Sequence, residues 1–337
     1  MKKPTDFAVL LSGFLTEYLP AQKGASVQTI ASYRDTFKLL LRYLRDEKGI
    51  SPEKVKLATI DASMITGFLK WLESERGCGI STRNQRLAAA RSFFRYAQFE
   101  FPENLDSFQK ILSLPSKKTT STVIPYLTAD EMRILLSQPD PSTISGRRDL
   151  AILCFLYDSG CRVQEMIDLC TGDLIFEPVG IAILHGKGGK TRRVPLEKNT
   201  VQLLKRYFAD QKLDRTNNAA VFTGNRGNKL TREGVTYIIS KYVEPARSAM
   251  PSIPERITPH IFRHTRAMVL LQSGVSLIYI LDFLGHTDVK TTEIYAKTDT
   301  ELKRKAIEGT MPAVFEESGK RDWTENTSLM EWLNELC

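Results

Sequence analysis

The sequence predicts a mainly α-helical protein with a small β-sheet, organised in two domains. The chain of 337 residues is long for one domain, and two domains are the usual arrangement at that length. Apolar residues recur at helical steps of three and four on both sides of a short group of extended runs between residues 172 and 196. A hydrophobic content of 42% is ample for a sizeable core.

The first part of the chain shows helical patterns and no hairpin signal. Apolar residues are spaced by three and four over residues 30–44, with Ser26 as a suitable N-cap and Gly49 at the end. A second helix is expected over residues 62–72, and a third from Ser81 onward. We therefore expect this part to be all-α.

A linker follows at LPSKKTTSTVIPYL, residues 114–127. The stretch has two prolines, two lysines and a run of serine and threonine without periodicity, which is typical of a linker. Thr128 then caps a new helix, with Glu131 at the capping-box position. The expected divisions are a helical domain at 1–115, a linker at 116–127, a second domain at 128–310 and a C-terminal tail at 311–337.

The second part of the chain is mixed. Helices are expected at 147–157 and 162–169, followed by the extended runs LIFEP, GIAILHG and KTRRVPL. The GKGG at 186–189 predicts a hairpin turn between the last two runs. Helices dominate again from Asn199, and the tail ends in SLMEWLNEL, whose apolar stripe needs a surface to pack against.

Composition narrows the class of protein. A net charge of +8 favours a polyanionic partner, although such an excess is also common in proteins that bind no nucleic acid. Five cysteines without a CxxC pair indicate neither a disulfide framework nor a thiolate zinc site. Because no run of about 18 apolar residues and no signal-peptide cleavage site occur, we expect a cytoplasmic protein without a membrane span.

Three of the four histidines lie in two short segments, TPHIFRHTR and LGHTDVKTTEIY. His260 and His264 are four residues apart and would share a helix face, as zinc ligands do. Ile261 stands where the hydrolytic zinc motif needs Glu, and Arg263 would bring a cation beside the metal. We therefore expect no metal site.

Taken singly, the other candidate residues have structural interpretations. Arg162 could form a salt bridge to Glu165 or Asp168. Lys187 lies at the tip of an exposed turn, and His286 could simply end a helix.

Together and in order, these residues resemble the tyrosine recombinase (phage integrase) family. The segments SGCRVQEMIDL, GKGGKTRRVPL, TPHIFRHT and LGHTDVKTTEIYA match the family's Gly-x-Arg-x-x-Glu box, hairpin lysine, Pro-His-x-x-Arg-His box, and Leu-Gly-His followed nine residues later by Tyr. The resemblance covers about residues 125–300. It implies an all-α, SAM-like core-binding domain at the N-terminus and a mixed α+β tyrosine-recombinase catalytic domain.

The resemblance implies a site-specific recombinase that cuts and rejoins DNA through a 3′-phosphotyrosyl intermediate. Two guanidiniums can hold the non-bridging oxygens of the phosphate in transition. A phenol with a pKa of about 10 needs a base or a cationic pocket to attack, and a hairpin lysine can protonate the departing 5′ oxygen. The residues assigned catalytic roles are Arg162, Lys187, His260, Arg263, His286 and the nucleophile Tyr295.

Because the bond is exchanged rather than hydrolysed, we expect no ATP, no metal and no other cofactor. The implied partner is double-stranded DNA, bound by a homotetramer on two sites that is a monomer when free in solution. Lys190 is an alternative to Lys187 on the same turn, and His264 is expected to pack or to support the site from behind. The residues expected to contact DNA are Arg83, Arg86, Arg91, Lys190 and Arg192, with a solvated helix face as the alternative for the first three.

Several functions remain open at this point. A type IB topoisomerase-like enzyme would share the arginine, lysine and tyrosine chemistry, and a DNA-binding protein with a decayed site would share the fold. Among recombinases, Xer-type dimer resolution competes with integration, excision or transposition of a mobile element. Arg266 and Met268 replace a Phe-Ala-Thr run common in Xer-type members, which favours the mobile element.

Overall fold

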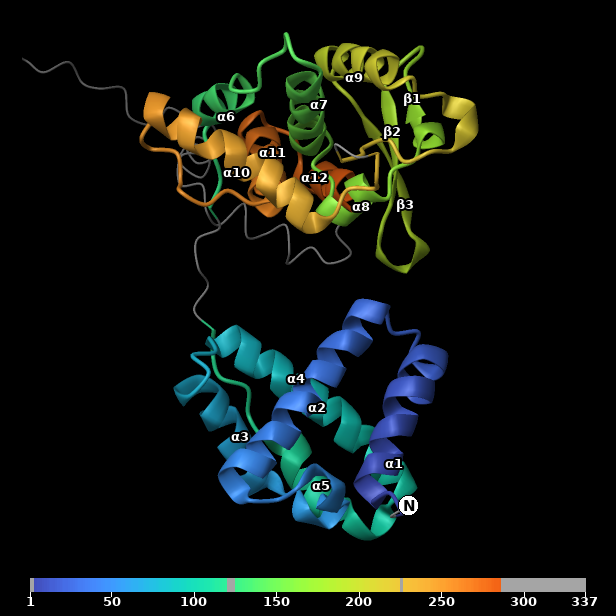
Figure 1. Cartoon of the computed structure of the whole chain (residues 1–337), viewed down its shortest axis with the longest axis vertical. Coiled ribbons are helices and arrows are strands. Elements are labelled where there is room, and N and C mark those ends of the chain that lie inside the picture. Colours follow the sequence, from blue (N-terminus) through green and yellow to red (C-terminus); the bar gives the residue numbers. More distant parts are fainter. Residues whose placement is uncertain (1–2, 120–124, 225–226, 286–337) are drawn as a thin grey trace, which may run out of the picture. The chain divides into compact units, whose positions relative to one another are not determined.

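The computed structural model describes residues 3–119, 125–224 and 227–285. The chain divides into two compact units, residues 1–122 and 123–337 (Figure 1). Each unit has a large hydrophobic core of its own. Within the described ranges, no helix combines the length and the apolar character that crossing a membrane requires.

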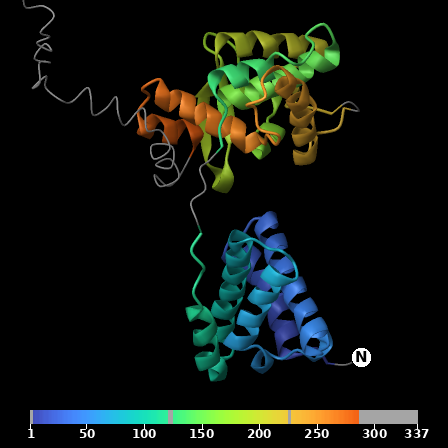
Figure 2. The same cartoon turned by 90° about the vertical axis from the view of Figure 1, so that its left-hand side faces the viewer.

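Within residues 3–119 of the first unit, all the regular elements are helices, as the sequence predicts. Figure 2 shows its helices packed side by side as a bundle. The rings of Phe14 and Phe37 both meet Phe93 edge-on in its core, with centroids 5.4 and 5.0 Å away. Its longer helices are α1 (Asp6–Gly13), a π-helix (Phe14–Gln22), α2 (Val27–Lys48), α3 (Ala62–Ser74), α4 (Ile80–Glu100) and α5 (Leu105–Ser113).

Local sequence signals set the ends of α2 and α6. The Ser26 hydroxyl accepts a hydrogen bond from the amide of Thr29 at the start of α2, and Gly49 ends that helix with a φ of 65°. In α6, the amide of Thr128 donates to the Glu131 carboxylate (2.8 Å) while the Glu131 amide donates to the Thr128 hydroxyl (3.2 Å). Both predicted caps, including the capping box, are confirmed.

The second unit combines helices with a small sheet that lies at one edge of it (Figure 1). β1 (Leu174–Ile175), β2 (Ile181–His185) and β3 (Thr191–Pro195) form a three-stranded antiparallel sheet in that order. The two longer strands are joined through the predicted glycine-rich turn. The helices are α6 (Ala129–Leu136), α7 (Ile144–Ser159), α8 (Val163–Ile167), α9 (Lys198–Gln211), α10 (Arg232–Ala249), α11 (Pro259–Gln272) and α12 (Leu277–Leu284).

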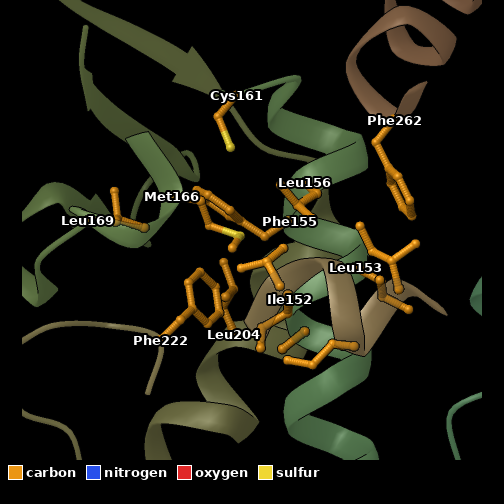
Figure 3. Packing of buried hydrophobic residues seen from close by; sticks show 14 of the residues in the cluster. Ile152, Leu153, Phe155, Leu156, Cys161, Met166, Leu169, Leu204, Phe222 and Phe262 are labelled. Carbon is orange, nitrogen blue, oxygen red and sulfur yellow. The ribbon is translucent and has the colours of Figure 1, made fainter. Parts of the chain in front are cut away.

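Helix α7 runs through the middle of this unit (Figure 1). Its buried side chains Ile152 and Phe155 pack toward Phe222, and Leu153 and Leu156 toward Phe262 of α11 (Figure 3). A helix buried on two sides is held rigidly by close packing. The core therefore fixes the position of the residues that follow the end of α7, where Arg162 lies.

Candidate active site

The end of α7 places the first site residue. Gly160 caps the helix with a φ of 54°, a left-handed conformation that favours glycine. A Cβ at this position would lie 3.1 Å from side-chain atoms of both Leu284 and Phe283. Two residues later, Arg162 is the N-cap of α8. The sharp turn thus brings Arg162 beside the end of α12.

Glu165 holds Arg162 in place and is itself buried, with 4% of its surface exposed. Its carboxylate accepts hydrogen bonds from the Arg162 amide (2.8 Å) and the Arg162 Nη1 (2.9 Å). It also accepts two from Arg192, at 2.9 and 2.8 Å. Burial alone would raise the pKa of Glu165, but the hydrogen bonds and charges of the two arginines hold it at about 2. This carboxylate is therefore ionised at neutral pH.

Arg263 projects from α11 into the interior, where the residue is 3% exposed. Its Nη1 donates to the carbonyl of Gly160 at 2.8 Å, and its Nη2 donates to the carbonyl of Leu284 at 2.5 Å. The guanidinium therefore connects the ends of α7 and α12.

Three arginines converge on the C-terminal turn of α12. The last carbonyls of a helix have no partner within it and carry the negative end of the helix dipole, so cations are stabilised there. Each arginine donates to a different one of three consecutive carbonyls. The pairs are Arg192 with Phe283 (2.9 Å), Arg263 with Leu284 (2.5 Å) and Arg162 with Gly285 (3.2 Å).

His260 lies on the first turn of α11 and is exposed. Partial desolvation lowers the pKa of His260, and the nearby charges of Arg263, Arg162 and Arg232 lower it further. The imidazole is therefore neutral at physiological pH and can donate or accept a hydrogen bond. The structure thus brings three predicted catalytic residues together, namely Arg162, His260 and Arg263.

His264 lies one turn further along α11, with its ring centroid 6.4 Å from that of His260. Desolvation, helped by the charges of His260 and Arg263, lowers the pKa of His264 from 6.5 to about 4. Because the folded chain resists this protonation, the unfolded chain binds the proton first as the pH falls. Stability should therefore be unaffected above pH 6.5 and decline between 6.5 and about 4.

His264→Gln should reduce the fall in the free energy of unfolding between pH 6.5 and 4 by up to about 3 kcal/mol, because glutamine does not titrate. Urea unfolding at several pH values between 4 and 7 would measure it. His260 also lowers stability as the pH falls, and it remains in the variant. The dependence of the free energy of unfolding on pH should therefore become weaker but not disappear. Parallel curves for the two proteins would contradict the assignment.

Of three further predicted residues, the structure places only the backbone of Lys187. That residue opens the turn Lys187–Gly189 between β2 and β3. The alternative, Lys190, ends that turn and is exposed. His286 and Tyr295 lie outside the described residues, as does the predicted C-terminal helix. Their catalytic roles stay predictions.

The structure gives Arg83 and Arg86 partners within their own unit. Arg83 is 8% exposed and donates to the carbonyl of Pro115 at 3.2 Å. Arg86 donates to the backbone of Ser32 on α2 at 2.9 Å. Arg91 reaches the hydroxyl of Ser116 at 3.5 Å. Arg83 therefore does not lie on a solvated helix face. Contact of these three arginines with DNA stays a prediction, and their hydrogen bonds within the unit do not favour it.

Sequence reasoning named Glu165 only as a possible salt-bridge partner of Arg162, a pair that the structure forms at 2.9 Å, and it gave no role to Arg232. The Arg-x-x-Glu spacing was the available signal for Glu165, because residues three apart meet across a helix start. Arg232 is exposed at the start of α10, where its Nε donates to Gln164 at 2.9 Å. No local signal marks Arg232, because its proximity to His260 arises from packing between distant segments.

Both units of the chain match models of known protein families. Residues 125–301 match the phage integrase family, and residues 13–100 match the phage integrase N-terminal SAM-like domain. The chain belongs to the phage integrase family. Arg162, Arg263 and His260 therefore lie in the catalytic domain of a tyrosine-type site-specific recombinase or integrase, as the resemblance implied.

Curated relatives agree with this assignment. The chain is 38% identical over 338 residues to y4rC of Sinorhizobium fredii, covering 100% of both. It is 32% identical to tyrosine recombinase XerD of Listeria monocytogenes, covering 88% of this chain and 96% of XerD.

The solved structures show the fold. XerH site-specific recombinase bound to its difH substrate matches with a TM-score of 0.65 at 23% identity, over 88% of this chain and 83% of that one. The Tn1549 transposon integrase, in complex with transposon right end DNA, matches with a TM-score of 0.67 at 16% identity, over 89% and 99%. The predicted fold class, a helical SAM-like domain followed by a mainly helical catalytic domain with a small sheet, is confirmed.

Proposed function

We propose that this protein cuts and rejoins DNA strands at specific sites through a 3′-phosphotyrosyl intermediate on Tyr295. The observation that carries the proposal is the convergence of Arg162 and Arg263 on one turn, with His260 beside them. Two forked cations next to a neutral imidazole can bind a phosphate and manage a proton. That turn ends one residue before His286, which the sequence assigns to the same site.

The proposed chemistry divides the work among the side chains. Arg162 and Arg263 hold the non-bridging oxygens and stabilise the charge that grows in the transition state. His260 and His286 donate to the same phosphate or accept the proton of the phenol. Lys187 protonates the departing 5′ oxygen. A 5′ hydroxyl from a second duplex reverses the step and rejoins the strands in a new pairing.

Strand exchange between two duplexes separates this function from its rivals. Two labelled duplexes that carry the DNA flanking the protein's own gene should yield recombinant strands of hybrid length. A type IB topoisomerase-like enzyme would relax supercoiled DNA without producing hybrids. A DNA-binding protein with a decayed site would bind and do neither.

We propose that the biological role is integration, excision or transposition of a mobile element. The sequence around Arg266 and Met268 supports this role. Xer-type dimer resolution is the competing role, and the 32% identity to XerD favours it. Mapping the cleavage positions on the flanking DNA would decide between them, because an element's ends and a dimer-resolution site lie in different places.

We further propose that the enzyme acts as a homotetramer in which the tail, residues 311–337, docks on a neighbouring subunit. A groove of about 590 Å³ on the catalytic domain combines apolar side chains such as Phe176, Val201 and Leu270 with charged ones, a mixture suited to the tail's apolar stripe and its acidic residues. Deletion of residues 318–337 should weaken assembly on two DNA sites at least tenfold more than binding to one site, measured by mobility shift. Equal weakening of both would indicate docking within the same subunit.

A further inference from the structure

We propose that Arg192 is a positioning residue for the catalytic arginines rather than a contact to DNA. This inference rests on the proposed function and extends it to a side chain on β3. Only 11% of the Arg192 side chain is exposed, and all three of its guanidinium nitrogens donate to groups within the fold. Its hydrogen bonds point inward, to one carboxylate and one carbonyl.

Arg192 connects two parts of the site that are distant in sequence. Its Nη1 and Nη2 hold both oxygens of Glu165, and its Nε donates to the carbonyl of Phe283 at 2.9 Å. Glu165 orients Arg162, and Phe283 belongs to the turn that receives Arg162 and Arg263. The Arg192 guanidinium therefore sets the distance between Glu165, which holds Arg162, and the end of α12.

The surrounding backbone is shaped around this arginine. Gly285 has a φ of 64°, and a Cβ there would lie 3.0 Å from the Cδ of Arg192 and 3.1 Å from its Nη1. A side chain at Gly285 would thus displace either the arginine or the turn.

Loss of Arg192 should redirect Arg162. Oε1 of Glu165 is now shared between the two arginines, and Oε2 accepts from Arg192 and from the Arg162 amide. Without Arg192, the buried carboxylate would have one guanidinium left to neutralise it. Arg162 should then move from Gly285 to a bidentate pair with Glu165, away from the phosphate.

The first test is the crystal structure of Arg192→Gln, which does not depend on any activity. The expected result is an Arg162 guanidinium that holds both oxygens of Glu165 and has left the carbonyl of Gly285. An Arg162 that keeps its bond to Gly285 overturns the proposal. Arg192→Lys, which keeps the charge but lacks the fork, provides the same test should the Gln variant not fold.

The second test is the rate of covalent adduct formation on a nicked suicide duplex, at saturating protein. Both Arg192 variants should form adduct about 100-fold more slowly, because small misplacements of catalytic groups have effects of that size. Their duplex affinity should stay within tenfold. The matched control is Arg193→Gln, the exposed neighbour on β3, which should keep the wild-type rate. Rates for Arg192→Gln within threefold of wild type would overturn the proposal.

A double-variant cycle distinguishes positioning from general damage. Glu165→Gln and Arg192→Gln should each slow adduct formation. The double variant should form adduct at least tenfold faster than the two separate losses multiplied together would predict, because it leaves neither buried charge unpaired. Independent, multiplicative losses would overturn the proposal. If the wild-type protein formed no adduct, the proposed function would fail, while the structure of Arg192→Gln would still decide the role of Arg192.

Discussion

Arg263→Ala should abolish DNA cleavage and also destabilise the fold. The buried guanidinium is a hydrogen-bond partner of the carbonyls of Gly160 and Leu284, and an unsatisfied buried carbonyl costs about 1–3 kcal/mol. The free energy of unfolding should therefore fall by about 2–5 kcal/mol. Cleavage should fall at least ~10³-fold because a transition-state donor is lost as well.

Urea unfolding and suicide-substrate cleavage measure these two effects separately. Arg263→Lys is the matched control, since it retains the charge but cannot fork between two carbonyls and a phosphate. It should recover part of the stability and little of the cleavage. An Arg263→Ala protein with wild-type stability would show that the two carbonyls do not depend on this side chain.

Arg162→Ala should slow cleavage strongly while leaving folding and duplex binding nearly unchanged. The Arg162 side chain is 36% exposed, and its partner Glu165 retains both hydrogen bonds from Arg192. The loss of stability should therefore be about 1 kcal/mol. Cleavage should fall ~10²–10³-fold, whereas duplex affinity should stay within about tenfold, or roughly 1.4 kcal/mol.

Binding by mobility shift and cleavage of the nicked substrate are measured on the same preparation. Arg206→Ala, at an exposed arginine on α9, controls for the loss of one positive charge. If Arg162→Ala reduced binding and cleavage to the same extent, Arg162 would be a structural arginine, and its pair with Glu165 would be its whole role.

Much of the fold follows from local signals in the sequence. Ser26 and Gly49 bound α2, and Thr128 with Glu131 starts α6, because caps satisfy backbone groups of their own helix. The hairpin of β2 and β3 follows from its glycines. The helices before residue 26 were not predicted: Pro20 lies inside the π-helix, and a proline usually argues against helix at its position.

The sequence predicts which residues form the candidate site but not how they are arranged. The order of the motifs identified Arg162, His260 and Arg263, and the structure brings them together. Nothing local indicates that three arginines share the last carbonyls of α12, because those contacts join segments far apart in the chain. The partner of Arg192 was not predicted for the same reason, since the buried Glu165 lies on α8.

The central claim is that these side chains activate Tyr295 against one phosphate. Its most direct test traps the protein on a nicked suicide duplex, digests the adduct and identifies the modified peptide by mass spectrometry. The account predicts one nucleotide-bearing peptide, with the 3′-phosphate on Tyr295, and no adduct from Tyr295→Phe. A phosphate on any other residue, or an undiminished adduct from Tyr295→Phe, would contradict it.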